Sequence, residues 1–241
     1  MSFKKLSIVI PVYNEESTIL LILQKIKSVH LLENLQKEII IVNDFSRDNS
    51  DAIISEFISN NPELEIKYFQ HQKNQGKGAS VRTAVKEATG EYLIIQDADL
   101  EYDPNDYNAM ITPILSGKAD VVYGSRFMNG TPHRVLFFWH TFANKFITSL
   151  SNIATNLSLT DVETCYKLFE TKTIQNIRLS ENKFGFDPEV TAKISRIPNI
   201  KIYEVGISYF GRTYQQGKKI GWKDGVRAIY CIIKYAVFKM N

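Results

Sequence analysis

The sequence has few cysteines and lacks a segment long and apolar enough to cross a bilayer. Cys165 and Cys231 lie far apart and form no C-x-x-C motif, which excludes a disulfide framework and a zinc ribbon. No window reaches the roughly 18 uncharged apolar residues of a spanning helix, because Arg227 and Lys234 interrupt the best candidate. The N-terminus has no apolar core of a signal peptide. We therefore expect a cytoplasmic protein that at most touches a membrane surface.

Several nucleotide and hydrolase motifs are also absent. The sequence contains neither a Walker A loop nor a G-x-G-x-x-G after its first apolar strand, so P-loop NTPases and dinucleotide oxidoreductases lose support. A Ser–His–Asp elbow is missing, and the histidines show no metal-ligand spacing, so we expect them to be surface or packing residues. The segment Asn74–Ala79 (NQGKGA) can present backbone N–H groups to an anion, or it can be a structural turn.

Composition indicates a folded globular protein whose charge is unevenly distributed. Of 241 residues, 44% are hydrophobic and 23% charged, which is typical of globular domains and not of disordered chains. The net charge of +3 is too small for the whole surface to bind nucleic acid. From Phe210 onward, however, the sequence contains seven Lys or Arg and a single acidic residue. This part therefore has a net charge of +6, and the first 209 residues have a net charge of −3.

Short apolar runs rich in β-branched residues alternate with amphipathic helical segments. The predicted strands are 6–11, 38–43, 66–70, 92–96 and 120–124, and one intervening helix is expected over 77–89. Such alternation predicts βαβ units and a mostly parallel sheet. After Gly124 it stops: residues 133–158 can form one long amphipathic helix, and 165–170 and 200–209 resemble further strands. We expect one domain, 1–241, with a nucleotide-binding half (1–124) and an acceptor-side half (125–241).

Polar and mostly acidic side chains follow four of the five strands. They lie in the segments Pro11–Glu15, Asn43–Ser46, Asp97–Asp99 and Gly124–Arg126. Any one of these segments can be a turn or a helix cap. Ligands of open α/β sheets bind beyond the carboxyl ends of the strands, so the convergence of these residues at one edge predicts a site there.

Asp97 and Asp99 form the sharpest candidate, because residues two apart in an extended segment face the same way. Two hard oxygen ligands suit Mg²⁺ or Mn²⁺, whose remaining positions a diphosphate and water can fill. Glu101 can add a third carboxylate. The alternative is that one of the aspartates caps the next helix, although Asp103-Pro104 is a better helix start.

Several segments, in this order, resemble the family 2 glycosyltransferases of the GT-A fold. Within that family they are similar to the polyprenyl-phosphate glycosyltransferases related to dolichol-phosphate mannose synthase. The matching segments are PVYNE (11–15), NDFSRDNS (43–50), NQGKGAS (74–80), DADLEYDP (97–104), GSRF (124–127), TDVETCYKLF (160–169), FGFDPEVTAKI (184–194) and ISYFGRTYQQGKKIGWKDG (207–225). The first, second and fourth are common to many members, and the last three are more specific to the dolichol-phosphate-mannose-synthase-like branch.

The resemblance implies a mostly parallel, Rossmann-like sheet flanked by helices, an inverting transfer, and a role for each matching residue. The residues implied to hold the base and ribose of a nucleotide sugar are Pro11, Tyr13, Glu15 and Asp44, with Lys77 and Ala98 also lining the donor site. Asp97, Asp99 and Glu101 would hold the metal on the diphosphate, and Arg126, Arg212 and Lys218 would contact phosphates. The sequence departs from many relatives at Asn43, where they have aspartate, and at Glu101, where some have glutamine; it also lacks the transmembrane extension of some relatives.

The acceptor decides whether a general base is needed. A polyprenyl phosphate is already anionic and needs only cations to position it, whereas a glycan hydroxyl must lose its proton. For a hydroxyl, Asp161 is the candidate base, with Glu163 and Asp187 behind it; Asp161 can equally be a helix cap. The nucleotide base and the sugar, UDP-hexose or GDP-mannose, stay open. A binding protein without catalysis is the alternative from another class, and Asp97, Asp99 and Arg212 argue against it.

The basic C-terminal segment favours an anionic acceptor at a membrane. Its cations are interleaved with interfacial residues: Lys218, Lys219, Lys223 and Arg227 lie among Ile220, Trp222, Tyr230 and Ile233. A helix docked on the core with a solvated basic face is the alternative. The aromatic residues Phe137, Phe138, Trp139, Phe142 and Phe146 are likewise either a lipid-facing patch or core.

Overall fold

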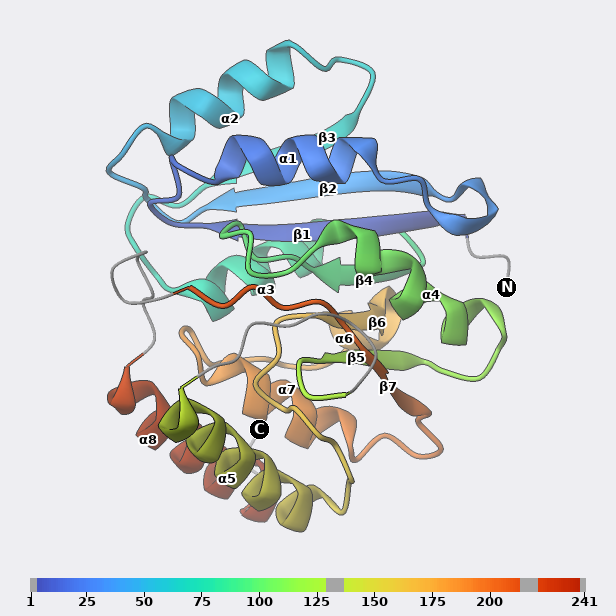
Figure 1. The fold of residues 1–241 in the computed structure, drawn as a ribbon, viewed down its shortest axis with the longest axis vertical. Coiled ribbons are helices and arrows are strands. Elements are labelled where there is room, and N and C mark those ends of the chain that lie inside the picture. The colour runs from blue at the N-terminus through green and yellow to red at the C-terminus, as the bar shows by residue number, and fades with distance from the viewer. Residues whose placement is uncertain (1–3, 129–136, 213–220, 239–241) are drawn as a thin grey trace.

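A computed structural model describes residues 4–128, 137–212 and 221–238 (Figure 1). Its centre is a seven-stranded sheet with the order β3-β2-β1-β4-β6-β5-β7. The strands are β1 (Lys5–Val12), β2 (Gln36–Asn43), β3 (Glu65–Gln70), β4 (Tyr92–Ile95), β5 (Val121–Ser125), β6 (Lys167–Glu170) and β7 (Ile202–Gly206). The predicted α/β fold with a mostly parallel sheet is therefore confirmed.

The first half follows the βα alternation expected from the sequence. Strand β1 pairs in parallel with β2 on one side and with β4 on the other, and β2 pairs in parallel with β3. The apolar runs of β1 and β2 are almost wholly buried, as continuous apolar strands are in a sheet covered on both faces. The helices of this half are α1 (Ile19–Ser28), α2 (Ser50–Ser59), α3 (Lys77–Glu87) and α4 (Tyr107–Leu115), with short 3₁₀ turns at Leu32–Asn34 and Pro104–Asp106.

The second half departs from the alternation at β6. This strand lies between β4 and β5 and is antiparallel to both, whereas β7 is parallel to β5. The strand expected over 165–170 begins only at Lys167, because the preceding residues form a loop that runs past the end of β4. The sheet thus continues from the first half into the second without interruption.

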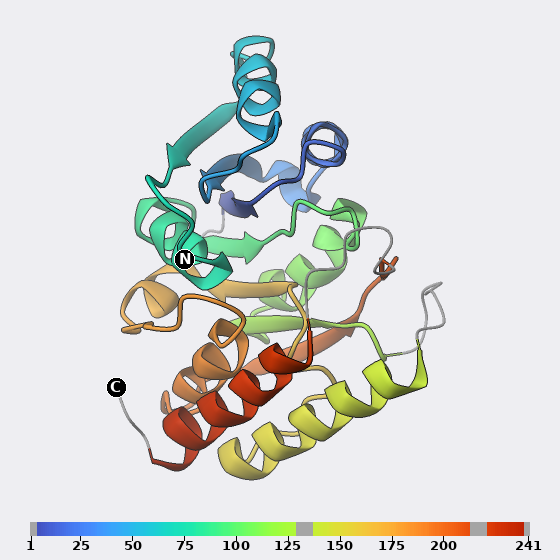
Figure 2. The same cartoon turned by 90° about the vertical axis from the view of Figure 1, so that its left-hand side faces the viewer.

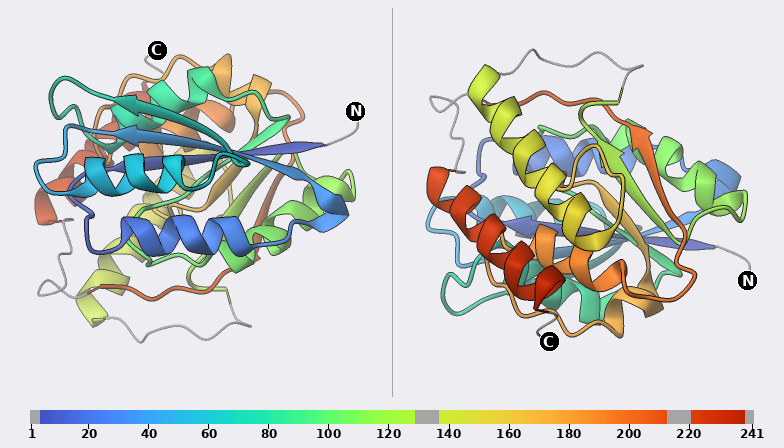
Figure 3. Two further views of the ribbon diagram at one scale, coloured as in Figure 1. Left: turned by 90° about the horizontal axis from the view of Figure 1, so that it is seen from above. Right: turned by 90° about the horizontal axis from the view of Figure 1, so that it is seen from below.

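Three helices of the second half gather below the sheet in Figure 1. They are α5 (Phe138–Thr155), α7 (Phe186–Ile194) and α8 (Trp222–Cys231), the last continuing as a π-helical turn over Ile232–Val237. The short helix α6 (Thr171–Gln175) instead follows β6 directly and packs against α3. The helix expected over 133–158 is confirmed from Phe138 to Thr155; residues 133–136 lie outside the described part. Figures 2 and 3 show α5 and α8 running side by side on the outer face of this layer, and no described helix is long and apolar enough to cross a membrane.

Candidate active site

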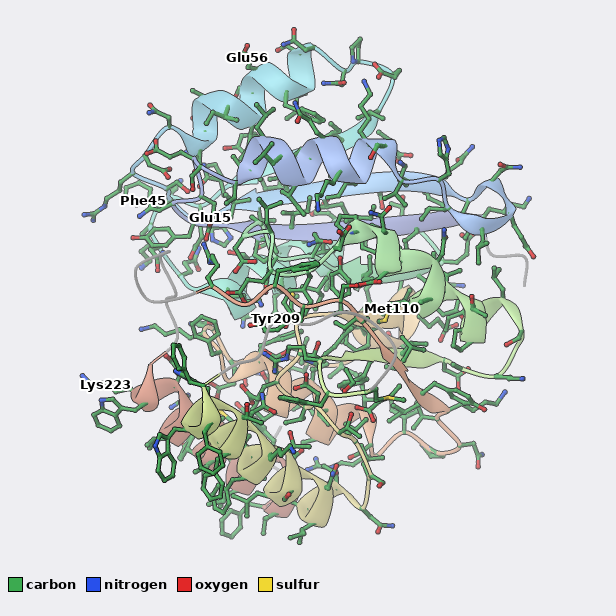
Figure 4. The ribbon with its side chains drawn as sticks, in the orientation of Figure 1. Glu15, Phe45, Glu56, Met110, Tyr209 and Lys223 are labelled. Carbon is green, nitrogen blue, oxygen red and sulfur yellow. The ribbon has the colours of Figure 1, made fainter. Side chains whose placement is uncertain are left out.

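The carboxyl ends of β1, β2 and β4 bring the predicted acidic residues to one edge of the sheet. Figure 4 shows Glu15 and Phe45 at the side of the molecule to which β1 and β2 point. The chain turns sharply there: Asn14, Phe45 and Leu100, each just beyond one of these strands, have positive φ angles of 51°, 63° and 64°. Strained backbone of this kind, held by the surrounding structure, is common at functional sites.

Lys77 and Asp97 form an ion pair with an Nζ–Oδ1 distance of 2.6 Å. Lys77 is the first residue of α3, and Asp97 follows β4, so the glycine-containing loop and the strand end meet. Burial disfavours the charged ammonium, but the negative field of Asp97, Cys165 and Asp187 prevails and raises the pKa of Lys77 well above its usual value. The site therefore contains a fixed cation beside its first carboxylate.

Arg212 brings a second cation to the site from the segment after β7. Its Nη2 lies 2.8 Å from Oδ2 of Asp99, its Nη1 lies 3.2 Å from Oε2 of Glu15, and its Nε lies 3.6 Å from Oε1 of Glu101. Burial, with the charges of Asp97 and Glu101, raises the pKa of Asp99 to about 7, and Arg212 opposes this shift. The guanidinium thus neutralises a dense group of acids at the edge of the sheet.

Glu101 shares the Arg212 guanidinium with Asp99, and its carboxylate also braces the C-terminal segment. Its carboxylate accepts hydrogen bonds of 2.7 Å from the backbone N–H of Arg212 and from the hydroxyl of Tyr209. Among the described residues, no three His, Cys, Asp or Glu side chains come close enough to hold a metal ion. The predicted set of Asp97, Asp99 and Glu101 is therefore not formed here, and Asp97 and Asp99 remain as a pair of hard oxygen donors.

Asp44, implied to contact the base or ribose, holds the loop before α3 in this structure. Its carboxylate accepts from the backbone N–H groups of Gln75 (2.9 Å) and Gly76 (2.6 Å) and contacts Nδ1 of His71 at 2.7 Å. The other ring nitrogen of His71 lies 3.0 Å from the hydroxyl of Thr83. The sequence predicts a surface or packing role for His71. In the structure its ring lies between Asp44 and Thr83, and the one sequence signal for these contacts is its position directly after β3.

The same loop is pressed against the segment before α7. Gly76 has φ +97°, and a Cβ on it would lie 2.4 Å from the backbone oxygen of Asn182. A Cβ on Gly78 would meet the backbone oxygen of Glu181 at the same distance. Both glycines are therefore required by close backbone approach, and Gly76 also by its conformation. The loop acts as a structural turn, and its two bonds to Asp44 fix it at the site.

Arg126 and Asp161 form a buried bidentate ion pair. Nε and Nη2 of Arg126 lie 2.6 and 2.7 Å from the two carboxylate oxygens, and the backbone N–H of Arg126 donates to Oδ2 at 3.1 Å. The Asp161 side chain is fully buried. The guanidinium of Arg126 also lies over the ring of Tyr209, 5.2 Å from its centroid, which links it to the Arg212 segment. Asp161 is thus buried, and both of its carboxylate oxygens bind Arg126.

The remaining predicted residues are distributed unevenly. Pro11 pairs with Val42 within the sheet, Tyr13 is partly exposed just after β1, and Ala98 is buried between the two aspartates. Lys218 lies outside the described residues. Asp103 caps the turn before α4, as its sequence predicts, by accepting from the backbone N–H of Asn105 at 3.0 Å.

Comparison with known proteins identifies the class. The model of glycosyl transferase family 2 matches residues 7–178, so the chain belongs to this family. The chain is also similar in fold to glucosyl-3-phosphoglycerate synthase from Mycobacterium tuberculosis, solved with Mn²⁺, UDP-glucose and phosphoglyceric acid. That match has a TM-score of 0.73 and 14% identity, and it covers 97% of this chain and 80% of the other. It confirms the GT-A fold.

Two characterised relatives act on polyprenyl phosphates according to their names. The chain is 26% identical over 235 residues to dolichol-phosphate mannosyltransferase from Pyrococcus furiosus, covering 96% of this chain and 64% of the relative. It is 26% identical over 193 residues to undecaprenyl-phosphate 4-deoxy-4-formamido-L-arabinose transferase from Yersinia enterocolitica, covering 80% and 57%. The chain thus spans somewhat less than two thirds of the length of these relatives.

Proposed function

We propose that the protein is an inverting glycosyltransferase that moves a sugar from a nucleoside diphosphate to a polyprenyl phosphate. The observation that carries this proposal is the pairing of two carboxylates with two cations, Lys77 with Asp97 and Arg212 with Asp99, at the carboxyl edge of the sheet. Such an edge is the ligand site of open α/β folds. The names of both relatives support the lipid phosphate as acceptor.

The donor set fits Mg²⁺ or Mn²⁺ held by two residues. Asp97 and Asp99 supply hard oxygens, and Mg²⁺ is commonly bound through one or two carboxylates together with substrate phosphates and water. When bound, such an ion neutralises charge on the diphosphate of the donor. Glu101 is assigned to the support of Arg212 and Tyr209 instead of to the metal.

Lys77 and Arg212 then stabilise the charge of the leaving group. As the bond to the anomeric carbon breaks, negative charge grows on the departing diphosphate. Lys77 and Arg212, now held by Asp97 and Asp99, are close enough to the site to stabilise that charge. The hydrogen bond from the backbone N–H of Gly76 to Asp44 fixes the turn from which the side chain of Lys77 extends.

The burial of Asp161 favours a phosphate acceptor over a glycan hydroxyl. A hydroxyl acceptor needs a base with an accessible oxygen, and both oxygens of Asp161 bind Arg126. A phosphate monoester attacks as an anion without such a base. We assign Asp161 to the positioning of Arg126, whose guanidinium, with that of Arg212, can orient the acceptor phosphate.

A surface of exposed aromatic and aliphatic side chains on α5 and α8 suits contact with a membrane. We call it the aromatic face. Its members are Phe137, Phe138, Trp139, Phe142, Phe146 and Ile153 of α5 and its approach, and Trp222, Val226, Tyr230 and Ile233 of α8 and its continuation. These residues are 45–81% exposed, which decides against the alternative that they are core.

Basic residues border the aromatic face, as Lys223 and Arg227 do on α8. In Figures 1 and 4, α5 and α8 both begin on the side of the molecule to which β1 and β2 point. Aromatic side chains mixed with cations favour the interface of an anionic bilayer. We infer peripheral contact with a membrane, where a polyprenyl phosphate is presented.

The test is to follow nucleoside diphosphate release from a panel of UDP- and GDP-sugars with Mg²⁺ or Mn²⁺. Each donor is assayed with and without a short polyprenyl phosphate. We expect one donor to give lipid-dependent release. Release that is indifferent to the lipid with every donor would overturn the assignment of the acceptor.

A further inference from the structure

Glu163 has a buried carboxyl oxygen that takes no part in the binding of the nucleotide sugar or of the polyprenyl phosphate as proposed above. The residue lies in the loop between α5 and β6, two positions after Asp161 and two before Cys165. Its Oε1 is buried and has no hydrogen-bond partner among the residues that the structure describes. Leaving such an atom unpaired costs roughly 1–3 kcal/mol, so the position needs a physical reason.

Two buried ion pairs determine the electrostatic environment of Glu163. On one side is the Arg126–Asp161 pair, and on the other Lys167 of β6 binds Asp187 of α7. All four charged groups act on the Glu163 carboxyl. Because each cation already has its own anion, neither pair neutralises Glu163 fully.

The same setting connects Glu163 to the donor edge. Asp187, the charged group that acts most strongly on Glu163, also acts on Lys77, the partner of Asp97. The loop of Glu163 passes the end of β4, where the backbone N–H of Cys165 donates to the hydroxyl of Tyr102 at 3.0 Å. The thiol of Cys165, two positions after Glu163, interacts with Asp97, so the loop that carries Glu163 reaches the donor edge.

The electrostatic surroundings make this carboxyl neutral. Burial and the charge of Asp187 raise the pKa of Glu163 to about 8, while Lys167 and Arg126 only partly oppose them. Near pH 7 the group is thus mostly a carboxylic acid, with one O–H donor and free acceptor capacity. A group that both donates and accepts suits a neutral polar ligand such as a hydroxyl, and its lack of charge makes it a poor ligand for a metal ion.

We propose that Glu163 is a specificity-determining residue that hydrogen-bonds a hydroxyl of the transferred sugar through Oε1, the carboxyl oxygen without a partner among the described residues. This inference rests on the proposed glycosyltransferase function. A sugar lacking the matching hydroxyl would leave the buried oxygen unpaired, and sites of this kind reject deoxy analogues for that reason.

The experiment compares binding of the nucleotide sugar with binding of the nucleoside diphosphate alone. UDP-glucose, UDP-galactose and GDP-mannose are titrated calorimetrically with Mn²⁺ against UDP and GDP, first on the natural protein and then on Glu163→Leu and Glu163→Gln. For the donor that binds best, we expect Glu163→Leu to weaken the nucleotide sugar on the order of tenfold or more and to leave the nucleoside diphosphate unchanged. Glu163→Gln should retain most of the affinity, because an amide also donates and accepts.

Monodeoxy analogues of that donor then identify the hydroxyl. The natural protein should bind one analogue about as weakly as Glu163→Leu binds the full donor. Glu163→Leu should bind that analogue and the full donor with equal affinity. If Glu163→Leu binds the nucleotide sugar as tightly as the natural protein does, the role of Glu163 is overturned while the proposed function stands. The same holds if Glu163→Leu loses equal affinity for the nucleotide sugar and the nucleoside diphosphate at an unaltered melting temperature. If the natural protein binds no nucleotide sugar more tightly than the free diphosphate and transfers none, the proposed function itself fails.

Discussion

Nη2 of Arg212 donates to Oδ2 of Asp99 across 2.8 Å, although the two residues are 113 positions apart in the chain. Asp99 follows β4 in the first half, and Arg212 follows β7 in the second. This contact adds a cation from the second half of the chain to the acidic edge formed by the first half. Loss of Asp99 leaves Arg212 with Glu15 and Glu101 as partners, whereas loss of Arg212 removes the cation that all three acids share.

Asp99→Asn should lower transfer by about 10²–10³, which is the usual cost of removing one charge-stabilising group from a polar active site. Steady-state rates of nucleoside diphosphate release measure this loss. Asp120→Asn is the matched control, because Asp120 binds the backbone N–H of Lys201 at the far end of β5. Removing divalent metal with EDTA should bring the natural protein down to the rate of the variant and lower the variant little further. If Asp99→Asn released nucleoside diphosphate as fast as the natural protein, and EDTA slowed both equally, Asp99 would not hold the metal.

Asp161→Asn should destabilise the fold by about 3–5 kcal/mol, because it leaves the Arg126 guanidinium buried without its counter-charge. Urea unfolding followed by circular dichroism measures the change. Asp103→Asn is the control: its partner Lys25 is exposed, so we expect a loss of about 1 kcal/mol or less. If Asp161→Asn kept normal stability and lost only transfer, Asp161 would be a catalytic base after all.

Stability should fall in acid through Glu38, which is fully buried in β2. Although burial opposes its ionisation, hydrogen bonds from Lys67, Ser7 and Thr89 lower the pKa of this carboxyl from 4.5 to about 2. Because the folded pKa lies below the unfolded one, this contribution is complete above pH 4.5 and is lost as the pH falls toward 2. The shift corresponds to about 3 kcal/mol.

Urea unfolding at several pH values between 2 and 6 should therefore show a smaller acid-dependent loss in Glu38→Gln than in the natural protein. Glu65→Gln, at a half-exposed carboxyl on the neighbouring strand, should leave the pH profile unchanged. Identical profiles for the natural protein and Glu38→Gln would mean that other groups cause the acid loss.

Binding to vesicles of anionic lipid should weaken about tenfold in Trp139→Ser, because each apolar side chain that enters the interface contributes roughly 1.5–3 kcal/mol. Trp139 is 74% exposed on the aromatic face, whereas the control residue Tyr203 is 42% exposed on β7, away from that face. Vesicle flotation at fixed salt measures the binding. Equal losses in Trp139→Ser and Tyr203→Ser would contradict a membrane role for the aromatic face.

The first half of the fold and the acidic edge could be predicted because their signals are local. Buried parallel strands are continuous apolar runs, and residues directly after them must meet at one edge of the sheet. Strand β6 was harder to predict, since it has four residues and inserts in antiparallel sense between two strands already formed. Its register depends on pairing with distant chain segments.

The roles of individual charged residues were less predictable than their location. Glu101 is one of three acids spaced two residues apart, but its carboxylate accepts hydrogen bonds from Tyr209 and Arg212 of the C-terminal segment. Asp161 has the residue type of a base, and only its buried contact with Arg126 led us to propose a positioning role for it. In both residues the deciding partner comes from a different element, which local spacing does not reveal.

The most direct test of the account is to identify the lipid product. Purified protein is incubated with a short polyprenyl phosphate, Mn²⁺ and the active nucleotide sugar, and the lipid is analysed by mass spectrometry before and after treatment with a phosphatase. We predict that the lipid gains the mass of one sugar residue and resists the phosphatase, because its phosphate has become a diester. A lipid phosphate that stays unmodified and phosphatase-sensitive while nucleoside diphosphate is released would contradict the account.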